Sequence, residues 1–106
     1  MIDIKAVYEK DKLVHLTIDG HGGLEYSKDV ICAGVSSCYV GALNALNNAE
    51  NYKIIVEEGH GEVTRIHATN KHDEVVLETL MVQLETIRQA FPNRLKIQIS
   101  GKEGNK

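Results

Sequence analysis

Apolar and polar residues alternate one by one at the start of the chain, and this pattern limits the possible fold more than any other feature. The apolar positions Ile2, Ile4, Ala6 and Tyr8 alternate with Asp3, Lys5, Val7 and Glu9. A period of two is typical of a β-strand with one face in a core. A sheet built from such strands needs an apolar layer against one face, while its other face tolerates water or a second subunit.

Turn sequences between the alternating segments predict two hairpins. The sequence EKDK separates the first strand from a second one over residues 14–19, and the two form an antiparallel hairpin. Residues 52–68 hold two more strand-like runs around the sequence EGHGE, where we expect the glycines on both sides of His60 to take positive φ values. A last strand is predicted over residues 94–100.

Two segments have the spacing of amphipathic helices. Asp29 is a good N-cap for a helix that begins at Val30 and reaches the Asn-rich sequence at residues 44–51. A second helix covers residues 72–91 and ends before Pro92. The predicted buried stripes are Val35, Tyr39, Ala42, Leu43 and Leu46 on the first helix, and Val76, Leu77, Leu80, Leu84, Ile87 and Phe91 on the second.

The predicted order is therefore β-β-α-β-β-α-β. This order favours an α/β (α+β) two-layer sandwich, in which a single sheet has two helices packed on one face. A chain of 106 residues is long enough for one hydrophobic core, so we expect a single domain over residues 1–100 and a loose tail over residues 101–106.

Composition excludes several classes of protein. With 42% hydrophobic and 25% charged residues, the chain is typical of a soluble globular protein. A net charge of −3 argues against direct nucleic-acid or membrane binding and tolerates a basic peptide as partner. The alternating N-terminus lacks the regions of a signal peptide, which predicts a cytoplasmic protein with reduced thiols at Cys32 and Cys38.

The sequence GHGGLEYSKDVICAG places a histidine at a strand end and a cysteine at a helix start. A thiol attacks as its thiolate, and a helix N-terminus with a nearby imidazolium lowers a thiol pKa from about 8.5 to about 3.5–7.5. Cys32 has the helix position, and His21 is able to supply the imidazole and later to protonate a leaving amine. Backbone N–H groups at the helix start are candidates for an oxyanion site.

Plainer interpretations stay open for each of these residues. A cysteine in such a helix is commonly a small buried side chain, and a histidine beside glycines is commonly a turn residue. Cys38 lies about 240° further round an ideal helix than Cys32, which predicts a packing role. The remaining histidines have no strong zinc spacing, and we expect solvated or capping roles on a strand, in a turn, on a strand and at a helix entry for His15, His60, His67 and His72.

Residues 19–46 resemble the signature of the ribosomal-processing cysteine protease family, Prp. The matching positions are Gly20, His21, Asp29, Val30, Ile31, Cys32, Ala33 and Ser36. One departure is Gly22, where the family more often has Ala. The resemblance extends over nearly the whole chain through the order of strands and helices.

The resemblance implies a cytoplasmic, homodimeric endopeptidase without metal or organic cofactor. Its implied substrate is the precursor of the large-subunit ribosomal protein L twenty-seven, from which it removes a short N-terminal extension. His21 and Cys32 carry over as the catalytic pair, and Asp29 and Ser36 match supporting positions. The loop of Gly22, Gly23, Leu24, Glu25, Tyr26, Ser27 and Lys28 would cover the bound peptide.

Two alternatives remain from other classes of protein. A non-catalytic module would hold a ribosomal protein during assembly and use the loop as a clamp. A thiol redox sensor would need a second thiol within reach of Cys32, and the helical geometry speaks against Cys38. The sequence does not identify a third residue that orients His21. Asp19 is near in sequence, but the alternation of the strand favours a different direction for its side chain.

Overall fold

The computed structural model describes residues 1–20 and 30–102. Its elements are β1 (Ile2–Glu9), β2 (Lys12–Asp19), α1 (Val30–Ala45), the short 3-10 helix η2 (Ala49–Asn51), β3 (Tyr52–Glu57), β4 (His60–Arg65), α2 (Lys71–Ala90) and β5 (Leu95–Ser100). The β-β-α-β-β-α-β prediction is confirmed, with η2 as an addition between α1 and β3.

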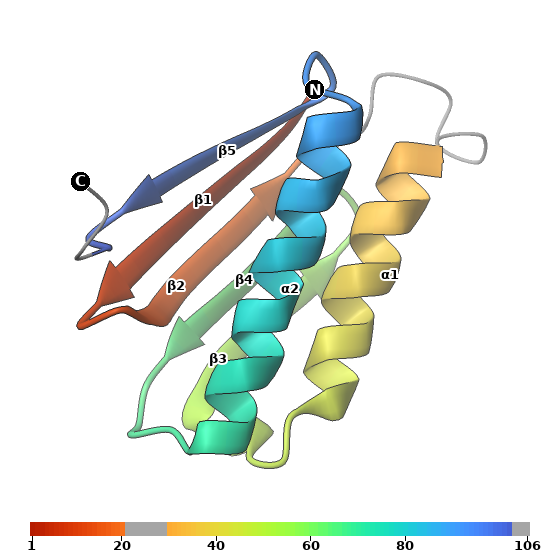
Figure 1. Cartoon of the computed structure of the whole chain (residues 1–106). Coiled ribbons are helices and arrows are strands. Elements are labelled where there is room, and N and C mark those ends of the chain that lie inside the picture. The colour runs from red at the N-terminus through yellow and green to blue at the C-terminus, as the bar shows by residue number, and fades with distance from the viewer. Residues whose placement is uncertain (21–29, 103–106) are drawn as a thin grey trace.

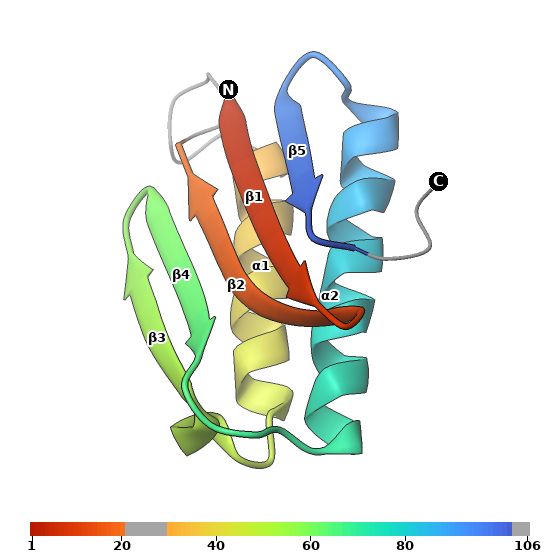
Figure 2. The same cartoon turned by 90° about the vertical axis from the view of Figure 1, so that its left-hand side faces the viewer.

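The five strands form one mixed sheet in the order β3-β4-β2-β1-β5 (Figure 2). Both predicted hairpins are present as the antiparallel pairs β1–β2 and β3–β4. An antiparallel β2–β4 pair joins the two hairpins, and β5 returns beside β1 in parallel. The end of β2 and the start of β4 consequently lie at the same end of the sheet.

The two helices cover the same face of the sheet and run antiparallel to each other (Figures 1 and 2). Alternate strand residues point towards them, as in β1, where Ile2, Ile4, Ala6 and Tyr8 are buried. No helix among the described residues covers the other face, which is mostly polar. The predicted two-layer sandwich is confirmed.

The helix stripes follow the predicted spacing, with one exception at the end of α2. Val35, Tyr39 and Ala42 are buried on α1, and Ile31 and Cys32 extend this stripe to the first turn. The prediction that Phe91 continues the α2 stripe is wrong, because its side chain is 43% exposed. Phe91 is the C-cap residue with φ −135°, so the backbone leaves the helix there and no longer directs its side chain to the core.

Asp73 is the fully buried charged residue of the core and connects the two helices. The backbone N–H groups of Asn47 and Asn48, just after α1, donate to its two carboxylate oxygens at 2.8 and 3.0 Å. Its own N–H donates to the side chain of Asn70, the N-cap of α2. The Asp73 carboxylate therefore fixes the start of α2 against the end of α1.

Replacing Asp73 by Asn tests this connection. An amide nitrogen would face one of the two backbone N–H donors, so we expect a loss of about 2 kcal/mol or more in the free energy of unfolding. Urea denaturation measures the change, with the exposed α2 variant Glu78→Gln as control. Equal stability of the two variants would contradict the role given to Asp73.

Candidate active site

Cys32 is the third residue of α1, as predicted, and its side chain is turned towards the sheet. Its exposed fraction is 9%, and Ile31 beside it is also buried. The expected N-cap, Asp29, lies outside the described residues. The structure thus confirms the helical position of Cys32 and leaves the capping of this helix as a prediction.

Cys32 borders a small cavity between the first turns of α1 and the end of the sheet. The cavity has a volume of about 80 Å³. Its described lining residues come from β1, the end of β2, α1 and the β3–β4 hairpin: Ile2, Ile18, Gly20, Cys32, Val35, Ser36, Tyr39, Val40 and residues 56–61. Ser36 and Cys32 share this cavity, as their spacing of four residues predicts.

The end of β2, the strand that leads to His21, also borders this cavity. Gly20, which directly follows β2, is one of its lining residues, and the next residue in the chain is His21. His21 itself lies outside the described residues, together with the predicted loop of residues 22–28. The described residues therefore bring together Cys32, Ser36 and the strand end before His21.

Gly20 occupies a position that requires glycine. Its φ is +100°, and a Cβ atom there would lie 2.5 Å from the carbonyl oxygen of Met1. Its N–H donates to the carbonyl oxygen of Gly59 at 2.9 Å, which extends the contact between β2 and the β3–β4 turn. A side chain at residue 20 would push the strand end away from β1.

Tyr39 and Gly61 form the floor of the cavity beneath the β3–β4 hairpin. The Tyr39 hydroxyl lies 2.8 Å from the carbonyl oxygen of Ile55 and 3.1 Å from that of Glu62, so its proton is shared between two strands. Burial raises the pKa of Tyr39 to about 12. The hydroxyl remains protonated at physiological pH and holds the hairpin against α1.

The predicted turn around His60 needs a correction. Gly59 has the expected positive φ of 75°, but Gly61 lies in β4 and has no positive φ, and His60 is the first residue of that strand rather than part of the turn. Glycine is required at residue 61 for space, because a Cβ atom would lie 2.8 Å from the Tyr39 ring.

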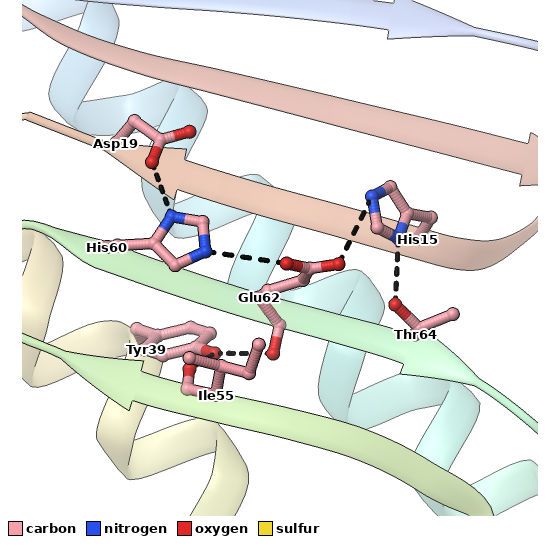
Figure 3. Close-up of polar contacts among 7 residues, drawn as sticks. All are labelled: His15, Asp19, Tyr39, Ile55, His60, Glu62 and Thr64. Carbon is pink, nitrogen blue, oxygen red and sulfur yellow. Dashed lines mark hydrogen bonds and ion pairs between the residues drawn. The ribbon is translucent and has the colours of Figure 1, made fainter.

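A chain of polar contacts crosses the open face of the sheet between β2 and β4 (Figure 3). His60 Nδ1 contacts the carboxylate of Asp19, and His60 Nε2 lies 3.4 Å from Glu62. Glu62 in turn lies 3.9 Å from His15, whose Nδ1 is 2.9 Å from the Thr64 hydroxyl. His60 remains accessible to solvent, as expected, and in addition pairs with two carboxylates that the sequence did not predict.

The carboxylates favour the charged form of His60. The hydrogen bond to Asp19 is the main reason that the pKa of His60 lies above its ordinary value of 6.5, and Glu62 adds to the effect. A raised pKa means that this stabilising contribution is complete below about pH 6.5 and is lost as the pH rises through the raised value.

The other histidines and Cys38 have structural positions. His72 Nε2 lies 2.9 Å from the carbonyl oxygen of Ala45, a capping contact at the end of α1 as predicted. His67 follows β4 rather than lying in a strand, because its N–H and that of Ile66 both turn to Asn51. Cys38 packs against the core and borders a separate groove between α1 and α2, which confirms its packing role.

Three further observations concern the thiols, metal binding and membrane spans. Cys32 and Cys38 are both thiols rather than a disulfide pair. In the part of the chain that the structure describes, no group of three or more His, Cys, Asp or Glu side chains has the arrangement of a metal site. No helix within residues 1–20 and 30–102 is long and apolar enough to cross a membrane.

A cysteine in the first turn of a helix, facing a cavity that also receives a strand end followed by histidine, is an arrangement typical of cysteine peptidases. Comparison with known families agrees with this class. The family model described as cysteine protease Prp matches residues 1–96. The chain therefore belongs to the Prp family of cysteine proteases.

Individual relatives agree in sequence and fold. The ribosomal processing cysteine protease Prp of Staphylococcus aureus is 28% identical over 101 residues, which span 91% of this chain and 94% of the relative. A crystal structure of an essential ribosomal processing protease Prp from S. aureus, in complex with a covalently linked product peptide, superposes with a TM-score of 0.84 at 24% identity, covering 94% of this chain and all of the other. A second structure, with a substrate peptide, gives a TM-score of 0.79, the same identity and the same coverage of both chains.

The cavity floor is tested by replacing Gly61 with Ala. The new methyl group would press on a tyrosine ring held by two carbonyl groups, so we expect a loss of about 1–3 kcal/mol in the free energy of unfolding. Gly41→Ala on α1 is the matched control, because no atom lies within 4 Å of its Cβ position. We expect this control to be neutral or stabilising by up to about 1 kcal/mol. If both variants had equal thermal stability, the close approach of Tyr39 to residue 61 would be refuted.

Proposed function

We propose that this protein is a cytoplasmic cysteine endopeptidase that processes a ribosomal protein, with Cys32 as nucleophile and His21 as acid–base. The substrate that we infer is the precursor of large-subunit protein L twenty-seven, which loses a short N-terminal extension. The single observation that carries the assignment is the cavity bordered by both Cys32 and Gly20, the residue before His21. The name of the S. aureus relative supports ribosomal processing.

The proposed reaction has two stages. The Cys32 thiolate attacks the scissile carbonyl carbon and forms a C–S bond, and the tetrahedral intermediate then breaks its C–N bond while His21 gives a proton to the leaving amine. Water, from which His21 removes a proton, attacks the thioester and releases the new carboxyl end and the thiol. Backbone N–H groups at the start of α1 stabilise the oxyanion in both stages.

Other residues have supporting roles in the proposal. Asp29 caps α1, and Ser36 lies one turn beyond Cys32 on the same cavity. The loop of residues 22–28 covers the bound peptide. Glu58 lies in the β3–β4 turn at the cavity edge, and its acidic side chain suits a basic substrate. The functional unit is a homodimer without direct nucleic-acid binding.

Replacing Cys32 by Ala tests the nucleophile. We expect the variant to fold normally and to leave a precursor peptide uncleaved, because the C–S bond cannot form. Mass measurement of full-length precursor after incubation detects the shortened product. Cys38→Ala is the matched control and keeps the native cleavage rate, since Cys38 borders a different groove.

Cleavage by Cys32→Ala at the native rate would refute the assignment of the nucleophile. An intact precursor after incubation with the native protein, together with tight binding, would instead support the non-catalytic assembly module.

Coupling of His21 to Cys32 is tested by alkylation in a Cys38→Ala background. The imidazolium of His21 favours the thiolate of Cys32. His21→Ala should therefore raise the pH at which the rate of Cys32 alkylation by iodoacetamide is half of its maximum. His67→Ala, an exposed residue after β4, is the control and leaves this pH unchanged. An identical pH profile for His21→Ala and the control would show that the two groups are not coupled.

A further inference from the structure

Asp19 and His60 meet on the open face of the sheet at the end of β2 (Figure 3). They are partners in the β2–β4 register and lie 41 residues apart in sequence. Asp19 is the last residue of β2, and the chain continues from it through Gly20 to His21. The side chain of His60 therefore contacts the strand two residues before the proposed catalytic histidine.

Three contacts of different kinds converge on Asp19, the last residue of β2, and on Gly20, which follows it. The Asp19 carboxylate contacts His60, the Gly20 N–H donates to Gly59, and Gly20 packs closely on the Met1 carbonyl group. The backbone contacts fix the distance of the strand end from its neighbours. The side-chain contact adds a restraint on its direction, at a strand end that would otherwise fray.

The surroundings of His60 are rich in carboxylates. Glu62 lies at its second ring nitrogen, Glu57 of β3 is its register partner, and Asp3 of β1 is the partner of Asp19. Directly opposite residues point to the same face, so His60 is a cation beside several carboxylates. Lys96 of β5 is a further cation on this face, as the register partner of Asp3. His15 of β2 is the other histidine in this chain of contacts. It contacts Glu62 and Thr64 but not Asp19.

We propose that His60 is a positioning residue for peptide cleavage: by holding the carboxylate of Asp19, it fixes the end of β2 and thereby the place from which His21 acts on Cys32. The proposal rests on the function proposed above for His21. It also assigns Asp19 a partner, so that Asp19 supports His21 through the strand. A displacement of about 1 Å at a catalytic group costs on the order of a hundredfold in rate.

The experiment compares His60→Ala, His60→Gln, Asp19→Asn and the double variant His60→Ala/Asp19→Asn. We expect His60→Ala to lower kcat at least about tenfold with a KM within about threefold of the native value, since the acid–base is misplaced while the peptide groove remains. His60→Gln keeps a side-chain N–H and should recover part of kcat. The double variant should be no slower than the worse single variant, because both substitutions remove one contact.

The alkylation profile separates positioning from a general loss of structure. In the Cys38→Ala background, His60→Ala should move the half-maximal alkylation of Cys32 to higher pH, the same direction as His21→Ala. His15→Gln is the matched control, because it lies in the same chain of contacts without touching Asp19. This control should keep native kcat and a native alkylation profile.

Native kcat in His60→Ala would overturn the proposal, and so would additive losses in the double variant or an unchanged alkylation profile. Thermal melting identifies variants that fail to fold, in which case His60→Gln and Asp19→Asn decide the question. Cleavage by Cys32→Ala would refute the proposed function itself. Loss of cleavage in Cys32→Ala with native behaviour of the His60 variants would refute the positioning role alone.

Discussion

One-sided burial of the sheet is the constraint on which the rest of the structure depends. Alternate side chains of β1, β2 and β4 are removed from water by two helices, and the intervening side chains face outwards. This arrangement determines which face of α1 packs on the sheet. Cys32 turns towards the sheet because it belongs to the same buried stripe as Val35 and Tyr39. The nucleophile proposed for the reaction is thus placed by the same burial that stabilises the fold.

The two faces of the sheet have separate roles at the end where the candidate site lies. The helix face supplies the cavity, with an apolar wall from Ile2 and Ile18 and a floor held by Tyr39. The open face supplies the polar contacts of His60 with Asp19 and Glu62. Both sets of residues come from the same strand ends, and His60 itself borders the cavity.

Periodicity in the sequence predicts the strands, both helices, both hairpins and the position of Cys32, because these depend on neighbours within a few residues. It does not predict which hairpins join, and the contact of Asp19 with His60 depends on the β2–β4 pairing. Gly61 shows a related limit: its pattern suggests a turn, while the actual reason for glycine is the Tyr39 ring from another element. Asp73 is missed for the same reason, since its partners follow α1 and lie 25 and 26 residues away.

The parallel pairing of β1 with β5 has a consequence for folding. β1 lies between β2 and β5, and its register with Leu95–Ser100 joins two strands that are separated in the chain by both helices and the three other strands. Until β5 has docked, β1 is an outer strand with unpaired backbone groups beside a partly covered apolar surface. A folding intermediate that lacks β5 must therefore keep this edge from associating with other chains.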